Sequence, residues 1–198
     1  MCKYRVYILK IRFKLLNSAI NKLIFRHPMY KCLTILALFL GLQASAQDLN
    51  KKKQDTYRNK EVMINTCTRD QVASFPEFKT MYDSMYESYA PDSATLLTLK
   101  PLLEGVKITI VMGTWCGDSK LQVPHFYKVT DKLGIPEEDI TLICVDGQKK
   151  AENGLIDNMN IERVPTFIFS KDGKELGRII ESPRDTLEKD AVALLSSK

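Results

Sequence analysis

The sequence lacks the patterns that identify several common classes of enzyme. It contains no glycine-rich phosphate-binding loop of either common type, which disfavours nucleotide chemistry. Its histidines and cysteines do not cluster at metal-ligand spacing, so we expect no metal and no cofactor. It also shows no internal repeat, no low-complexity tract and no second folded domain. The chemistry of this protein must therefore be sought in single residues of one domain.

Acidic residues are missing from one end of the chain. Residues 1–46 contain eight of the 29 Lys and Arg residues and no Asp or Glu. The rest of the chain carries 21 basic and 24 acidic residues, a net charge of −3. The formal net charge of +5 therefore belongs to the N-terminal segment, and we expect no binding of nucleic acid.

Residues 30–47 have the layout of a secretory signal peptide. A lysine precedes about ten apolar residues, and residues 44–46 form a small-x-small cleavage sequence, Ala-Ser-Ala. A membrane span needs about 20 apolar residues, so we expect no stable span after cleavage. We predict that residues 1–46 are a basic N-region and signal peptide of an exported protein, with Met29 as a candidate start. The alternative is a buried N-terminal helix.

Five cysteines occur, and Cys2 and Cys32 fall in the segment that we expect to be removed. An odd number then remains, which indicates at least one free thiol in an oxidising compartment. Cys144 lies in an apolar run and is predicted to be an inert core residue. Cys67 is left with two alternatives: it could be a partner thiol for Cys116, or it could form a structural bridge with Cys144.

The remaining chain predicts a polar linker over residues 47–60 and one domain over 61–198. Strands are predicted at 61–67, 107–112, 139–145, 166–170 and 175–180. Helices are predicted at 76–89, 93–104, 119–133 and after 182–185, with a loop or short helix at 149–160. Crossover helices require a parallel portion, whereas the last two strands form a hairpin. We therefore predict an α/β fold, with a central mixed sheet, helices on both faces and a C-terminal β-hairpin plus helix.

Cys116 stands where a predicted strand meets a predicted helix. Residues 114–120 read Thr-Trp-Cys-Gly-Asp-Ser-Lys and follow the β-branched run 108–111. The free N–H groups and the positive dipole end of a helix N-terminus favour a thiolate over a thiol. Because the thiolate is the form that attacks disulfides, Cys116 is the candidate nucleophile.

Three local features, taken in order, resemble the thioredoxin superfamily. They are Trp115-Cys116-Gly117 after the central strand, Pro124 within the following helix, and Val164-Pro165-Thr166 before the hairpin. The resemblance covers residues 61–198 and implies a thioredoxin-like fold. The Trp-Cys-Gly-Asp-Ser form further resembles exported thioredoxin-like proteins of envelope-rich bacteria. It implies a location in the periplasm or cell envelope of a Gram-negative bacterium, or secretion.

The resemblance also implies roles for the residues of this motif. Pro165 should follow a cis peptide bond and face Cys116, so that Val164, Pro165 and Thr166 bind the substrate backbone. A trans proline that merely starts a strand is the alternative. Trp115 should pack beside the sulfur and shape the groove, or serve only as a core anchor. Gly117 and Pro124 are supporting residues.

The sequence departs from the family pattern at three positions. Ser119 replaces the second cysteine, Asp118 replaces a frequent proline, and Ile110 stands where many thioredoxins have a buried acid. Ser119 can donate a hydrogen bond to the Cys116 thiolate, whereas the Asp118 carboxylate opposes a second negative charge. Without a local second thiol, a mixed disulfide on Cys116 must be released by another thiol.

These observations predict thiol–disulfide exchange by a monothiol protein. The expected partners are cysteine-containing client proteins and an external thiol donor, and the protein is expected to be a monomer. The alternatives are a non-catalytic binding or chaperone module and a redox sensor in which Cys116 is oxidised. His125 lies nine residues from Cys116 on the predicted helix and should point elsewhere, so we expect no Cys–His dyad.

Overall fold

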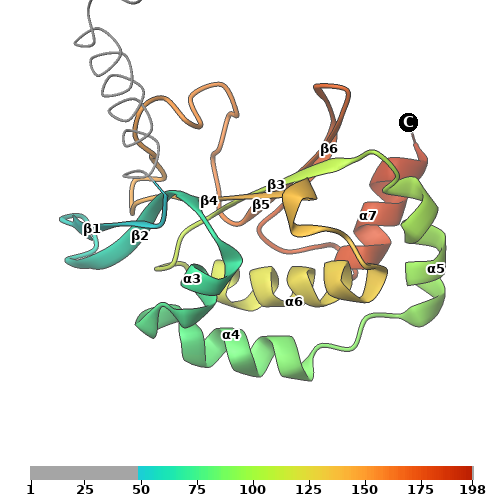
Figure 1. Ribbon diagram of the computed structural model, residues 1–198, viewed down its shortest axis with the longest axis horizontal. Coiled ribbons are helices and arrows are strands. Elements are labelled where there is room, and N and C mark those ends of the chain that lie inside the picture. Colours follow the sequence, from blue (N-terminus) through green and yellow to red (C-terminus); the bar gives the residue numbers. More distant parts are fainter. Residues whose placement is uncertain (1–48, 198) are drawn as a thin grey trace, which may run out of the picture. The chain divides into compact units, whose positions relative to one another are not determined.

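The structure of the protein is a computed structural model, which describes residues 49–197 (Figure 1). The predicted signal peptide, the candidate start Met29 and the cysteines Cys2 and Cys32 lie outside the described residues. The strands are β1 Lys51–Asp55, β2 Lys60–Cys67, β3 Lys107–Met112, β4 Ile140–Cys144, β5 Thr166–Lys171 and β6 Lys174–Ile180. The helices are α3 Arg69–Ser74, α4 Pro76–Ser88, α5 Ser93–Leu102, α6 Gly117–Leu133 and α7 Leu187–Ser196, with a 3₁₀ turn, η1, at Glu137–Asp139.

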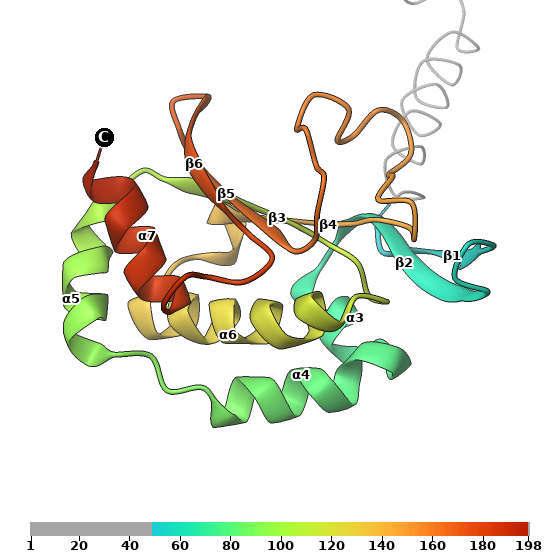
Figure 2. The ribbon, with the colours of Figure 1, turned by 180° about the vertical axis from the view of Figure 1, so that it is seen from behind.

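The six strands form one mixed sheet in the order β1-β2-β4-β3-β5-β6. Strands β3 and β4 pair in parallel, and the other neighbouring pairs are antiparallel. Helix α6 makes the crossover between the two parallel strands, and α7 follows the β5–β6 hairpin. This confirms the predicted α/β fold with a C-terminal hairpin and helix. In both ribbon views α5 and α7 lie side by side at one end of the sheet (Figure 2).

The central strand β3 is buried on both faces, as its continuous apolar sequence predicted. Ile110 and Met112 belong to a large core cluster that also contains side chains from α3, α4, α5, α6 and α7. Val111, which points the other way, belongs to a smaller cluster with Ile143, Val145, Ile156 and Val164. We call these the helix-face cluster and the second cluster. The alternation of side chains along β3 therefore divides the interior into two parts.

The second cluster is covered by the turns of residues 146–163, not by a long helix (Figure 1). Lys149, Asn153, Gly154 and Asn160 have φ angles of 61°, 55°, 70° and 51°. An α-helix requires φ near −63°, so the chain cannot stay helical through these positions. Of the alternatives at 149–160, the loop is correct: helices contribute to the helix-face cluster, and turns cover the second cluster.

Residues 47–60, predicted as a linker, contain strand β1 and its turn into β2. Strand β1 pairs antiparallel with β2 from Lys51 opposite Ile64 to Asp55 opposite Lys60. The strand lies at the edge of the sheet, and polar edge residues give no apolar alternation from which a strand could be read. The prediction of a linker was therefore wrong for this segment.

Helix α6 carries the predicted functional segment and begins at Gly117, two residues before its predicted start. Cys116 is its N-cap residue, and Gly134 ends it with a φ of 72°. Pro124 is buried inside the helix, as the predicted pattern requires. Placing the N-cap at Cys116 brings the sulfur to the first turn, where the unpaired N–H groups of a helix gather.

Candidate functional site

Cys116 lies at the carboxyl end of β3, at the start of α6. Its backbone N–H donates to the Gly113 carbonyl at 2.9 Å, and its carbonyl accepts from the Lys120 N–H at 3.0 Å. The side chain is half-buried and packs against the second cluster. Its thiol donates to the Val164 carbonyl, with 3.2 Å between sulfur and oxygen. The nucleophile predicted from sequence is thus partly accessible and is held by a distant part of the chain.

The peptide bond between Val164 and Pro165 is cis, as the resemblance implied. The Pro165 carbonyl accepts from the Glu181 N–H at 2.7 Å, and the Thr166 hydroxyl donates to the Arg163 carbonyl at 2.7 Å. Val164 and Thr166 are both buried. The structure therefore brings Val164, the residue before the cis bond, to Cys116, 48 residues earlier in the chain.

Ser119 is fully buried and belongs to the first turn of α6. Its hydroxyl oxygen accepts from the Gly113 N–H at 3.3 Å. Within residues 49–197 no hydrogen bond joins this hydroxyl to the Cys116 sulfur, whose proton is directed to Val164. Donation from Ser119 to the thiolate stays a prediction, and in this structure Ser119 instead fixes the loop before the cysteine.

Gly117 and Asp118 are exposed beside Cys116. A Cβ built on Gly117 would meet no atom within 4 Å, so packing does not demand a glycine there. The Asp118 carboxylate has no ion-pair partner within the described part of the chain. One side of the cysteine therefore presents open space and a free negative charge.

Trp115 forms the other side of the site. Its indole N–H donates to the Val145 carbonyl at 2.9 Å, and its ring packs against the second cluster. A Cβ on Gly113 would lie 2.6 Å from the indole, so glycine is needed there for the ring to fold back. The guanidinium carbon of Arg58 lies 4.0 Å from the centre of the indole ring. The indole thus serves both as a packed anchor and as a wall of the site.

Sequence reasoning missed Arg58 because its segment was taken as a linker. Asp55, at the end of β1, accepts from the Tyr57 N–H at 2.8 Å and from the Gly147 N–H at 2.5 Å. These bonds fasten the β1–β2 turn to the residues after β4. An aspartate followed by a polar turn was the available signal, but it does not say where in space the turn lies.

Cys67 and Cys144 lie elsewhere, in the helix-face cluster on adjacent strands. Both are buried and both are free thiols. A hydrogen bond with Cys67, together with burial, raises the pKa of the Cys144 thiol well above its ordinary value. This agrees with the prediction of an inert core cysteine. Neither thiol contacts Cys116 in the described structure, so the role of Cys67 as its partner has no support here.

His125 is also remote from the sulfur. Its ring stacks on Tyr89, with 4.2 Å between ring centres, on the helix side of the domain. Burial lowers the pKa of His125, although the nearby Glu188 carboxylate opposes this. Among residues 49–197 no group of His, Cys, Asp or Glu side chains could hold a metal ion. No helix in that range is long and apolar enough to cross a membrane.

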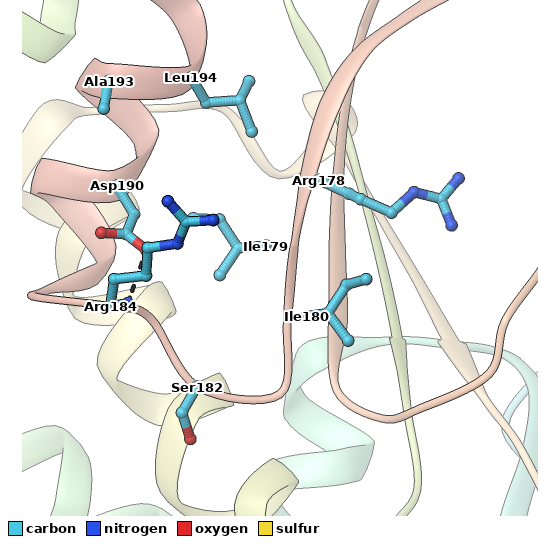
Figure 3. Close-up of a pocket in the computed structure, with 8 residues that line it drawn as sticks. All are labelled: Arg178, Ile179, Ile180, Ser182, Arg184, Asp190, Ala193 and Leu194. Carbon is cyan, nitrogen blue, oxygen red and sulfur yellow. Dashed lines mark hydrogen bonds between the residues drawn. The ribbon is translucent and has the colours of Figure 1, made fainter.

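A shallow pocket of about 480 Å³ lies between β6 and α7 (Figure 3). The Arg184 backbone N–H donates to Asp190 at 2.7 Å on its α7 side, whereas Arg178 points away from that helix (Figure 3). Cys116 does not line this pocket, and neither does any other site residue predicted from sequence. The pocket is therefore separate from the candidate site.

Comparison with known proteins adds to this geometry. Residues 105–193 match the thioredoxin family. The chain is similar to thioredoxin H2-1 of Oryza sativa subsp. japonica, at 32% identity over 43% of this chain and 57% of that one. It is 31% identical to a thioredoxin H-type of Picea mariana, over 43% of this chain and 63% of that one. The matches thus span less than two thirds of these relatives.

A solved structure of a protein of unknown function from Pseudomonas aeruginosa is 16% identical. The alignment covers 64% of this chain and 89% of that chain, with a TM-score of 0.48.

Proposed function

We propose that this chain, which has a thioredoxin-like fold and whose residues 105–193 match the thioredoxin family, performs thiol–disulfide exchange through Cys116. The observation that carries the proposal is the meeting of three features at one sulfur. Cys116 caps the N-terminus of α6, is half-buried, and lies 3.2 Å from the carbonyl of the residue before cis-Pro165.

The proposed reaction begins when the Cys116 thiol loses its proton. The thiolate attacks one sulfur of a client disulfide, a new S–S bond forms between Cys116 and the client, and the original S–S bond breaks. The second client sulfur leaves as a thiolate and takes up a proton. Ionisation also removes the S–H donor from the Val164 carbonyl, which becomes available to the N–H of an extended client.

Release of the client requires a second thiol. Ser119 occupies the position of a resolving cysteine, and Cys67 and Cys144 belong to the helix-face cluster. The proposal is therefore a monothiol cycle, in which an external thiol attacks the mixed disulfide. Attack on the client sulfur joins the donor to the client and frees Cys116, whereas attack on the Cys116 sulfur joins the donor to Cys116 and frees the client. The partners are cysteine-containing proteins and that thiol donor.

A second candidate is a module that binds clients with little turnover. The contact of the Cys116 sulfur with the Val164 carbonyl and the serine at position 119 favour this alternative. The layout of residues 30–47 supports export in either case, so we place the clients in the cell envelope or outside the cell. A test of capture and release separates the two functions.

The test uses a peptide disulfide and mass spectrometry of the intact protein. The expected result is a covalent adduct on the wild type that dithiothreitol removes, and no adduct on Cys116→Ala. Cys67→Ala is the matched control, because it also removes one thiol but leaves the site untouched. Unchanged capture by Cys116→Ala would contradict exchange through this sulfur and would favour the binding module.

A further inference from the structure

The turn between β1 and β2, residues 56–59, is built onto the candidate site. Asp55 holds it by accepting hydrogen bonds from the backbone N–H groups of Tyr57, Arg58 and Gly147. Burial raises the pKa of the Asp55 carboxyl, but these donors outweigh burial and leave the pKa below its ordinary value. An ionised aspartate thus fixes the turn to the loop that follows β4.

Gly147 permits this close approach. A Cβ at that position would lie 2.6 Å from Arg58 Cγ and 2.7 Å from Asp55 Oδ2. Contacts under 3.0 Å would force the turn to shift. The stem of Arg58 therefore rests on bare backbone, and its head reaches Trp115, the residue next to Cys116 in sequence.

The Arg58 guanidinium is exposed and lacks a carboxylate partner within residues 49–197. Its carbon lies 4.0 Å from the centre of the Trp115 ring and 5.4 Å from that of Tyr57. A guanidinium that stacks through its face keeps its N–H edges available, and these match a carboxylate in a two-bond arrangement. The site thus holds an oriented, unused anion receptor.

We propose that Arg58 is a specificity residue that binds a carboxylate of the client or thiol donor beside the disulfide attacked by Cys116. This inference rests on the proposed function and adds a substrate class to it: disulfides flanked by acidic groups. Asp118, an exposed carboxylate without an ion-pair partner among residues 49–197, lies two residues after Cys116 and repels the same clients there. The two charges together orient an acidic client toward Arg58.

The test measures the rate of Cys116 with two small aromatic disulfides. 5,5′-Dithiobis(2-nitrobenzoate) carries a carboxylate on each ring, and 4,4′-dithiodipyridine carries none. In both reactions the Cys116 thiolate attacks one sulfur, a mixed disulfide forms on Cys116, and the original S–S bond breaks. The aromatic thiolate that leaves, protonated in the pyridine case, is measured by its absorbance. The rate of Cys116→Ala is subtracted as the contribution of Cys67 and Cys144.

Arg58→Gln should lower the rate with the anionic disulfide about threefold, as expected for an exposed charge pair, and leave the neutral disulfide unchanged. Lys100→Gln is the matched control, since it removes one exposed positive charge on α5 and should change neither rate. The preference for the anionic disulfide should also fall as salt is added.

Five results would overturn the inference, three of them in the variants and two in the wild type. An unchanged ratio of the two rates in Arg58→Gln removes the carboxylate contact. An equal loss of rate with both disulfides in Arg58→Gln would mean that Arg58 only supports Trp115. An equal loss of rate in Lys100→Gln would mean that the effect comes from the net charge of the protein. If the wild type reacts with neither disulfide above the Cys116→Ala rate, the proposed function fails and this inference fails with it. Reaction with both but no preference defeats the inference alone.

Discussion

Two thiol environments share one sheet in this protein and differ in almost every physical respect. Cys116 lies beyond the end of β3, half-buried against the second cluster, with its sulfur directed at the Val164 carbonyl. Cys144, the last residue of β4, is fully buried beside Cys67 in the helix-face cluster. A cysteine at the end of a strand is thus a core residue, whereas a cysteine between a strand and the following helix is partly accessible.

This difference shows that side-chain packing decides which thiol can react. The three cysteines within residues 49–197 are all free, so oxidation state does not distinguish them. Cys67 and Cys144 are both buried among apolar side chains, and burial and the hydrogen bond with Cys67 raise the pKa of the Cys144 thiol, which disfavours the thiolate that exchange requires there. Cys116, by contrast, is only half-buried, at the residue where α6 begins.

The largest expected effect is on alkylation of the native protein by iodoacetamide. Cys116 should react at least about a hundredfold faster than Cys67 or Cys144, since the buried thiols need an opening of the core. The pKa of Cys144 is raised, so its thiolate forms only at pH values well above the ordinary range, and its labelling should stay slow as pH rises. Peptide mapping by mass spectrometry measures each site, and equal rates would remove the contrast.

A second pair of variants tests the two glycines that flank Trp115 and Cys116. Gly113→Ala should lower the free energy of unfolding by up to about 3 kcal/mol, because its Cβ would overlap the indole. Gly117→Ala should leave the free energy of unfolding unchanged or raise it by up to about 1 kcal/mol, because its Cβ meets open space. Urea unfolding measures both, and similar losses would show that Trp115 can move aside.

A third pair compares the thiols directly. Cys144→Ser places a hydroxyl in the apolar helix-face cluster and should cost about 1–2 kcal/mol of stability. Cys116→Ser should change stability by less than about 0.5 kcal/mol, since its side chain is already half exposed and polar at its tip. Urea unfolding again provides the measurement; a large loss in Cys116→Ser would mean that its bond to Val164 supports the fold.

The smallest effect is the pH dependence of stability on the two sides of the sheet. Burial lowers the pKa of His125 in the folded state. Below about pH 6.5 the unfolded chain therefore binds more protons at this site than the folded chain, and stability decreases as the pH is lowered. The pKa of Asp55 is also lowered in the folded state. Its contribution to stability is present above the unfolded pKa near 4 and is lost as the pH falls below that value. His125→Gln should remove the first slope, and Asp55→Asn should reduce the second.

Chemical denaturation at fixed pH values between 3 and 8 checks this order. The wild type should lose stability first in the histidine window and later in the aspartate window. An unchanged slope near pH 6 in His125→Gln would show that another group titrates there.

Much of this comparison follows from particular stretches of sequence. The run 107–112 is so apolar and β-branched that its strand was predicted with the bounds of β3. The cis bond before Pro165 follows from the resemblance, and the apolar run around Cys144 predicts a buried residue. The helix around Pro124 was predicted to within two residues at its start.

Other features escaped because their causes are not local. Strand β1 exists because β2 offers its backbone as a partner, and the polar side chains of an edge strand leave no apolar pattern. The covering of the second cluster by turns depends on several residues with positive φ, and the sequence does not identify each of these positions. The stacking of Arg58 on Trp115 joins residues 57 positions apart.

By itself, the amino-acid sequence determined which cysteine follows a buried strand at a helix start, which proline lies before the hairpin, and that one mixed sheet would hold them. Only the tertiary structure decided that Ser119 bonds to Gly113, that Cys67 adjoins Cys144, and that Arg58 stands over the indole. The reason is physical: local pattern records burial and backbone preference along the chain. Contacts between distant segments depend on how strands order themselves in the sheet and on which side chains then meet.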